Sequence, residues 1–196
     1  SFFLKDREIF IMPEEDELQI VYEAKDSNAT IQSLKALDAL CSDEEAVVIA
    51  PISAALKSLQ PAKRFIDSVI NLKLGMRIDP KKLKSELVSI GYTSSPIVEA
   101  EGEFSTRGGI IDIFSPNHAD PIRVEFFDDE IDSIRFFDSE SQMSLENIDS
   151  IRICPAAEFV PTELERLDVL PLIIDEYDRH LDELTTQSGD KKLPAG

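Results

Sequence analysis

Apolar residues recur about every third position between residues 27 and 40, at Ile31, Leu34, Leu37 and Leu40. This spacing predicts an amphipathic helix, because one face of a helix returns every 3.6 residues, and Ser27-Asn28 supplies good capping residues. The continuous apolar run 46–50 predicts a strand buried on both sides, and residues 53–56 predict a helix after it. Helix, buried strand and helix in this order are typical of an α/β layer.

A second helix is predicted after Asp79-Pro80, which offers an N-cap followed by a proline in the first turn. Leu83, Leu87 and Ile90 form its apolar face, and Gly91 is a natural residue to end it. The helix should therefore be short and well defined at both ends.

Beyond this helix the apolar period changes to two, which is the period of a strand. Three strands are predicted, at residues 109–114, 121–127 and 131–137, with turns at 117–120 and 128–130. One helix followed by a meander of at least three strands indicates a small α+β module.

Helical spacing returns from Pro161 onward, and we expect Pro171 to interrupt this material. The apolar positions are Leu164, Leu167, Val169, Leu170, Ile173, Ile174, Tyr177 and Leu181. Their packing partner is expected in the first segment of the chain or outside this chain.

The composition of the chain excludes several classes of protein. With 196 residues, 42% of them hydrophobic, it can form one or two domains with real cores. Its 20 Lys and Arg against 39 Asp and Glu give a net charge of −19, which disfavours a general binder of nucleic acid or of anionic membranes. It has no apolar run long enough to span a membrane and no signal pattern, so a cytoplasmic location is expected.

Two details of composition change this picture slightly. The two cysteines, Cys41 and Cys154, are interpreted as buried apolar groups, because they are too few for a disulfide scaffold or a four-cysteine zinc site. The chain begins at Ser1 without a methionine and closes on a polar tail, so we expect it to be a piece of a longer protein.

Charge is uneven along the chain. Residues 61–100 carry 7 Lys and Arg against 4 Asp and Glu, whereas the segments on both sides are acidic. The sign changes at Pro61, which is therefore the best candidate for a domain boundary. We interpret the basic residues of 61–84 as solvated faces and helix-end charges, and a DNA-binding module remains the alternative.

Signals of catalysis are mostly absent from the sequence. It contains no P-loop and no nucleophile elbow, and its two histidines, His118 and His180, have no further zinc ligand at the right spacing. The carboxylates of 128–130 are interpreted as solvated turn residues, although they are of the type that binds a hard cation. We expect no catalytic residue, no metal and no cofactor, with a nucleotide- or metal-dependent enzyme as the alternative.

Two long stretches carry a specific resemblance. They are GEFSTRGGIIDIFSP at residues 102–116 and PIRVEFFDDEIDSIR at residues 121–135. Together with flanking motifs they resemble the UvrB-homology module at the N-terminus of the bacterial transcription-repair coupling factors, the Mfd family, over roughly residues 7–160. UvrB shares some of these elements, but its P-loop and its tyrosine-rich hairpin have no counterpart here. The chain departs from the family at Gln142-Met143-Ser144, where Gln-Arg-Ser is common, and near Ser94, where an arginine is common.

The resemblance implies an α/β fold related to the P-loop NTPases, without the P-loop, that is split by an inserted small α+β domain with an antiparallel sheet. Residues 1–60 would be the first part of the α/β domain, 61–155 the inserted UvrA-binding domain, 156–185 the return into the α/β domain, and 186–196 a polar tail. The chain would be a non-catalytic adaptor that couples stalled transcription to nucleotide excision repair. The ATP-dependent DNA translocase, the RNA polymerase contacts and the DNA contacts would belong to other domains of the full-length protein.

The second predicted strand allows an independent interpretation of the docking face. Ile122, Val124 and Phe126 share one face, so Arg123, Glu125 and Phe127 share the other. An exposed arginine beside an exposed phenylalanine is typical of an interface. The other interpretation is a surface arginine paired with Glu125 or Glu103 and a phenylalanine in a second small core.

Carried over by motif position, the residues implied to contact UvrA are Arg107, Arg123 and Phe127. Glu125 and Asp129 are possible secondary contacts. Gly108 and Gly109 are expected to be structural, because a Cβ would clash in the tight turn before the strand.

Overall fold

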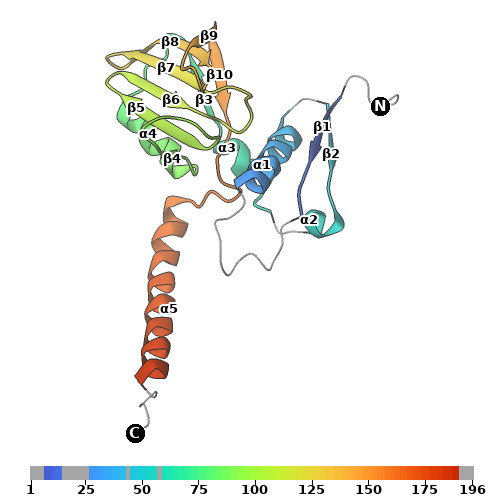
Figure 1. Cartoon of the computed structure of the whole chain (residues 1–196), viewed down its shortest axis with the longest axis vertical. Helices are drawn as coiled ribbons and strands as arrows, with labels where there is room; N and C mark the ends of the chain where they lie inside the picture. The colour runs from blue at the N-terminus through green and yellow to red at the C-terminus, as the bar shows by residue number, and fades with distance from the viewer. Residues whose placement is uncertain (1–6, 15–26, 43–44, 57–58, 190–196) are drawn as a thin grey trace. The chain divides into compact units, whose positions relative to one another are not determined.

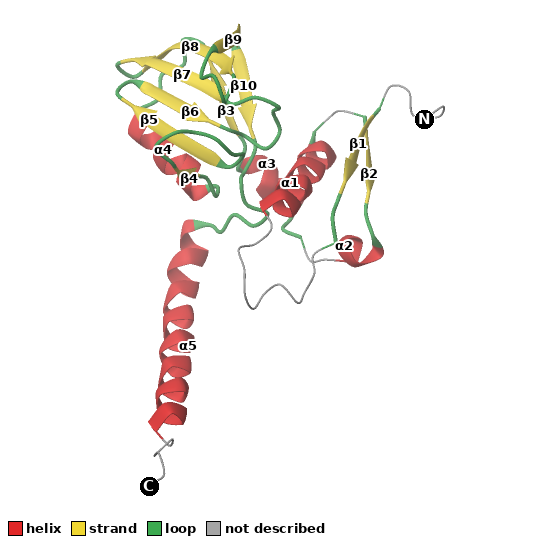
Figure 2. Cartoon of the chain, in the orientation of Figure 1, coloured by secondary structure: helices red, strands yellow, loops and turns green. Residues whose placement is uncertain are grey.

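The computed structural model describes residues 7–14, 27–42, 45–56 and 59–189 (Figure 1). It contains two compact units, residues 1–160 and residues 161–196, which are described separately below. The first unit is a mixture of helices and mostly antiparallel strands, and the second is a helix (Figure 2). Among the described residues, no helix has the length and apolar character needed to cross a membrane.

The N-terminal lobe, meaning the described residues from 7 to 67, is built on a parallel strand pair. Strands β1 (Glu8–Ile11) and β2 (Ala46–Ile49) pair in parallel, and helix α1 (Ser27–Cys41) connects and contacts them. Helices α2 (Ile52–Leu56) and α3 (Ala62–Asp67) follow. The predicted helices at 27–40 and 53–56 are confirmed. The core of this lobe contains Met12, Ile31, Leu34, Ala36, Leu37, Ala54 and Phe65, and Cys154, which follows β10 (Ser150–Ile153), packs into it.

The prediction that the strand at 46–50 is buried on both sides is wrong. Ile49 is 54% exposed and the other residues of β2 are only half-buried. Within the described residues, β2 has one partner strand, and α1 is the helix that contacts the pair. A continuous apolar run indicates that a strand needs cover on two faces, but it does not say whether the same chain supplies that cover.

The sheet module, residues 70–153, surrounds the larger core. Six strands lie in the order β4-β5-β6-β7-β8-β9, with β4 (Thr93–Ser94) parallel to β5 (Glu103–Arg107) and the other pairs antiparallel. Next come β6 (Ile110–Ile113), β7 (Ile122–Phe127), β8 (Glu130–Phe137) and β9 (Ser144–Asn147). A separate antiparallel pair joins β3 (Ile70–Lys73) to β10 (Ser150–Ile153).

Helix α4 (Pro80–Ser89) covers the apolar face of this sheet. Its fully buried Leu83 and Leu87 pack in one core with Ile111, Ile113, Ile122 and Val124. The Asp79 carboxylate accepts a hydrogen bond of 2.8 Å from the Lys81 N–H, as an N-cap should. The predicted helix and its capping residue are confirmed.

The predicted meander is confirmed as β6, β7 and β8, and three strands of the sheet lie beyond it. The sequence did not reveal β4, β5 and β9, which are rich in Ser, Thr and charged residues. Such residues carry no apolar alternation, so their pairing depends on strands that are already in place.

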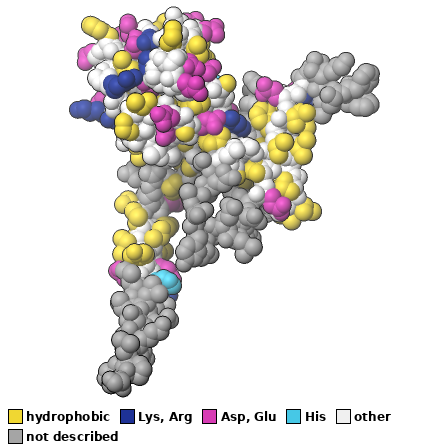
Figure 3. All heavy atoms as spheres, viewed as in Figure 1, with side chains coloured by type: hydrophobic (Ala, Val, Ile, Leu, Met, Phe, Trp, Pro, Cys, Tyr) yellow, Lys and Arg dark blue, Asp and Glu magenta, His cyan; other side chains and the backbone are white. Residues whose placement is uncertain are grey.

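Helix α5 (Glu163–Gly189) forms the second unit, with Pro171 inside it. The predicted interruption at Pro171 is wrong. A proline removes one backbone donor and crowds the preceding turn, but the 27-residue helix continues through it. The described apolar side chains between residues 167 and 177 are exposed, and Figure 3 shows them along the helix.

Candidate docking surface

The outer face of the six-stranded sheet carries a row of polar residues. Asp112 on β6 pairs in register with Arg123 on β7, which pairs with Arg135 on β8. Successive side chains of a strand alternate between faces, and Ile122 and Val124 are accordingly buried in the core on the opposite face. The predicted division of the second strand into a core face and an outer face is therefore confirmed.

Arg123 lies on the outer face, but it is not the exposed side chain that the sequence predicted. Its side chain is 11% exposed. Nε donates to Oδ1 of Asp112 at 2.7 Å, and Nη2 donates to Oδ2 of the same carboxylate at 2.9 Å. Nη2 also donates to Oε1 of Gln142 at 3.1 Å, and the guanidinium carbon lies 4.3 Å from the centre of the Phe137 ring. This arginine is held on several sides within its own sheet.

Arg107 reaches the same carboxylate from strand β5. Its Nη2 donates to Oδ2 of Asp112 at 3.0 Å, while its side chain is 55% exposed. Asp112 itself is buried, with 2% of its surface exposed. One buried carboxylate thus accepts hydrogen bonds from two arginines on two strands, and a large part of Arg107 remains accessible.

Phe127 ends β7 and is 79% exposed. Asp128, which follows it, has a φ of 59° and turns the chain towards β8. The suggestion that Phe127 belongs to a second small core is wrong for the described residues. An aromatic side chain with this exposure offers apolar surface at its end of the outer face.

Glu125 lies on the same outer face but interacts with a different arginine. It pairs with Arg135, and the Ser133 hydroxyl donates to it at 2.8 Å. The Arg135 guanidinium is the main cause that lowers the pKa of Glu125 to about 2. The arginines Arg107 and Arg123 therefore pair with Asp112, and not with Glu125 or Glu103 as one interpretation of the sequence had it.

Asp129 lies in the turn between β7 and β8, and its backbone carbonyl accepts a hydrogen bond from Ile78 at 2.8 Å. Its carboxylate is 3.7 Å from the Arg77 guanidinium, which also donates to Glu130 at 3.1 Å. Two carboxylates of this turn therefore face a cation of the same chain. Among the described residues, no group of acidic, histidine and cysteine side chains has a geometry suited to a metal ion.

The two glycines before β6 differ in the physical reason for their presence. Gly108 has a φ of 58°, and a Cβ there would meet nothing within 4 Å, so its backbone conformation and not a clash favours glycine. At Gly109 a Cβ would lie 3.0 Å from the carbonyl oxygen of Phe126, which is a close approach. The expected clash is thus found at Gly109 and not at Gly108.

The basic residues of 61–84 are partly engaged in ion pairs. Lys63 pairs with Asp67, Arg77 with Glu130 and Lys82 with Glu86. The exposed members of such pairs fit the interpretation as solvated faces and helix-end charges.

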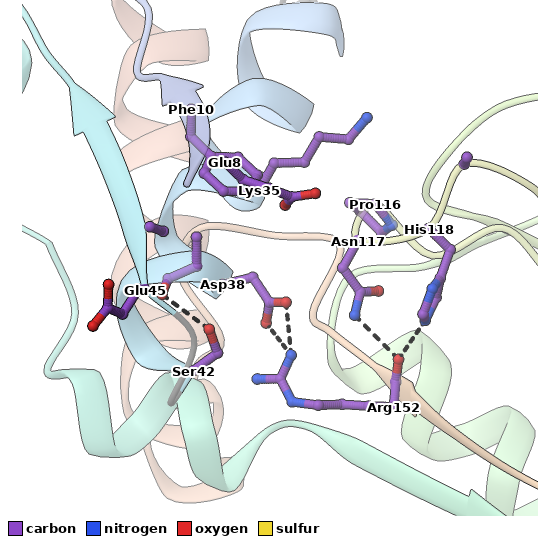
Figure 4. Close-up of a pocket in the computed structure, with 13 residues that line it drawn as sticks. Glu8, Phe10, Lys35, Asp38, Ser42, Glu45, Pro116, Asn117, His118 and Arg152 are labelled. Atoms are coloured by element: carbon purple, nitrogen blue, oxygen red, sulfur yellow. Dashed lines mark hydrogen bonds and ion pairs between the residues drawn. The ribbon is translucent and has the colours of Figure 1, made fainter. Parts of the chain in front are cut away.

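A pocket of about 440 Å³ lies between α1 and the loop after β6 (Figure 4). On its wall, Arg152 Nη1 donates to the carboxylate of Asp38 at 2.5 and 2.6 Å. Asn117 Nδ2 and His118 Nε2 bind the backbone carbonyl of Arg152 at 3.1 and 2.8 Å, and burial lowers the pKa of His118. These groups satisfy one another, and no motif or spacing in the sequence indicated that Asp38 would contact Arg152.

Sequence reasoning also missed Asp112 and Gln142. The alternation around Asp112 between Ile111 and Ile113 could have placed it on the outer face. The strand register that sets Asp112 opposite Arg123 could not be obtained in that way, because it depends on the length and shape of the intervening turn.

Comparison with known proteins relates the sheet module to one family and most of the chain to longer proteins. Residues 70–159 match the model of the UvrB interaction domain family. The chain is 38% identical over 157 residues to the transcription-repair-coupling factor of Bacillus subtilis (strain 168), a match that covers 80% of this chain and 13% of that protein. For the transcription-repair-coupling factor of Staphylococcus aureus (strain Mu50), the identity is 35% over 161 residues, covering 82% of this chain and 14% of that protein.

Proposed function

The chain belongs to the family of the transcription-repair coupling factors, and from this premise we propose that it is a non-catalytic adaptor. It binds the UvrA damage-recognition protein and thereby couples stalled transcription to nucleotide excision repair. The outer face of the sheet module is the docking surface. The chain spans 13–14% of the length of the relatives it matches, so contacts with RNA polymerase and DNA, and the ATP-dependent translocase activity, are assigned to other parts of the full-length proteins.

The observation that carries this proposal is the placement of two exposed side chains, Phe127 and Arg107, at one end of the outer face of the sheet. The turns from β5 to β6 and from β7 to β8 lie at the same end of the meander, which brings these two side chains to one edge. An exposed aromatic ring buries a large apolar area at a small entropic cost, and an arginine offers a planar fork to a carboxylate. The complementary surface is an apolar pocket beside an acidic group.

Arg123 contributes differently from Arg107. Asp112 and Gln142 use its Nε and Nη2 donors, which leaves the Nη1 edge for the partner. Glu125 and Asp129 are secondary contacts in this proposal. Each already faces an arginine of its own chain, so their hydrogen bonds to a partner would be weaker than those of an unpaired carboxylate.

The domain division is also part of the proposal. An inserted domain, expected from the sequence at residues 61–155, would lie between the two segments 1–60 and 156–185 of an α/β domain related to the P-loop NTPases. The parallel unit β1-α1-β2 supports an α/β architecture for the first segment. Phe65 packs in the N-terminal lobe, whereas the family match begins at residue 70, so the distribution of the cores favours a first boundary near residue 70. Residues 186–189 end α5, and 190–196 lie outside the described residues.

Calorimetric titration of the whole chain with purified UvrA tests the proposal. Phe127→Ala and Arg107→Ala should each weaken binding by about 2 kcal/mol, because both remove an exposed anchor of the interface. Val88→Ala on α4 is the matched control, since Val88 is an exposed apolar residue on the helix that covers the opposite face of the sheet.

The circular dichroism spectrum should be the same for all variants, because none of these side chains is buried. If the parent chain does not bind UvrA, the adaptor function is overturned. If the parent binds and both anchor variants bind equally well, the location of the docking surface is wrong.

A further inference from the structure

A buried carboxylate lies behind the two arginines of the docking surface, and no motif assigns it a role. We propose that Asp112 is a positioning residue for UvrA docking, which holds the guanidinium groups of Arg107 and Arg123 in the orientation that the partner meets. This inference rests on the proposed function of the same surface. It adds a residue that does not itself touch the partner.

The geometry shows that one carboxylate holds both arginines, in place of two separate surface ion pairs. Asp112 is 2% exposed, and three N–H donors approach its two oxygens at 2.7, 2.9 and 3.0 Å. Oδ1 accepts a hydrogen bond from the Nε of Arg123, while Oδ2 accepts one hydrogen bond from each arginine. The position of either guanidinium group is thus coupled to the other through one carboxylate oxygen.

The strand register explains how one carboxylate reaches both arginines. Arg123 stands directly opposite Asp112 on β7, and Ser105 stands opposite it on β5. Arg107 lies two residues beyond Ser105 on the same face, which is the diagonal position that a long side chain can span. Asp112 therefore occupies the central strand between its two partners.

Holding these side chains before binding has an energetic consequence. A free arginine loses rotamer freedom when a partner immobilises it, and this loss weakens binding. Gln142 and the ring of Phe137 restrain Arg123 further, at 3.1 and 4.3 Å. The group of Asp112, Arg107 and Arg123 also keeps a net positive charge, because one carboxylate compensates only one of the two guanidinium groups.

The experiment is a titration of UvrA with the whole chain carrying Asp112→Asn. Asparagine has nearly the same shape but no charge, and its amide nitrogen cannot accept from an arginine. We expect the dissociation constant to rise by about tenfold. Asp38→Asn is the matched control, because it removes another buried aspartate that pairs with an arginine, Arg152, away from the docking surface.

A thermodynamic cycle separates positioning from a loss of stability. In the double variant Arg107→Ala with Arg123→Ala, the additional change Asp112→Asn should leave the remaining affinity unchanged, since there is nothing left to position. If Asp112→Asn weakens binding equally in both backgrounds, or if it leaves or strengthens the affinity of the parent, the inference is overturned. An absence of binding by the parent would instead overturn the proposed function.

A measurement on the unmodified chain covers the case in which Asp112→Asn does not fold. Nitrogen-15 NMR of the arginine side chains should show slow exchange of the Arg123 Nε–H and hindered rotation of its guanidinium group. Rapid exchange and free rotation at Arg123 would contradict a fixed orientation and overturn the inference.

Discussion

The sheet module and the N-terminal lobe both contain apolar strands, but only the module covers them. Ile111, Ile113, Ile122 and Val124 of the module are almost fully buried between the sheet and α4. In the lobe, Ile9, Ile11 and Ile49 of the parallel pair are exposed although they belong to equally apolar strands. Figure 3 shows hydrophobic side chains at the surface of the lobe.

The two regions differ in how many faces of their sheets must be covered. An α/β layer with a parallel pair needs cover on both faces, whereas an antiparallel sheet can leave one face polar. The antiparallel sheet of the module is covered by its own helix on one face, and its other face carries the polar row of Arg107, Asp112 and Arg123. The module is therefore expected to depend on its own core, and the lobe on surfaces that the described residues do not supply.

The largest expected difference between the two regions comes from truncating one apolar side chain in each, a buried one in the module and an exposed one in the lobe. Leu87→Ala should destabilise the chain by about 3 kcal/mol, because it leaves a cavity in a fully buried site of α4. Ile49→Ala should cost less than about 1 kcal/mol, since its side chain is already half in water. Urea unfolding followed by circular dichroism measures both. Equal losses would show that the exposure of Ile49 does not reflect its surroundings in solution.

A smaller effect is expected at the turn beside the proposed docking surface. Gly108→Val should lower the stability by about 2 kcal/mol, because a branched side chain is strained at a φ of 58°. Gly108→Asn should cost clearly less, since asparagine tolerates this region of the backbone. Thermal unfolding of the two variants beside the parent gives the ranking. The reverse order would mean that the turn relaxes, and that the geometry near Arg107 is not fixed by glycine.

The smallest effect concerns the second ion pair of the polar face. Arg135 lowers the pKa of Glu125 to about 2, below its value in an unfolded chain. The stabilisation is therefore present above about pH 4.5 and is lost as the pH falls towards 2. Glu125→Gln should lower the stability at pH 7 by less than about 1 kcal/mol, because the pair is only partly buried.

Melting temperatures of parent and Glu125→Gln between pH 2 and pH 7 measure this effect. The two curves should separate at neutral pH and converge in acid. A constant difference across this range would indicate that the variant disturbs packing and not the ion pair.

The sequence alone predicted the elements whose apolar pattern is continuous. Helix α1, helix α4 with the Asp79 cap, and strands β6, β7 and β8 were obtained from spacing, because each must bury one regular face. The same argument assigned Ile122 and Val124 to the core and Arg123, Glu125 and Phe127 to the opposite face. The resemblance to the coupling factors, carried by the motifs of 102–135, added the family.

Only the tertiary structure decided which side chains on that outer face are accessible. Periodicity places Arg123 and Phe127 on the same side, yet the first is nearly buried against Asp112 while the second is exposed. The difference arises from strand register and from Gln142, which approaches from the turn before β9. Pairings between residues far apart, such as β3 with β10, were likewise beyond the sequence. The local sequence pattern determines which face a side chain lies on. Its contacts depend on segments that are distant in the sequence and meet only when the chain folds.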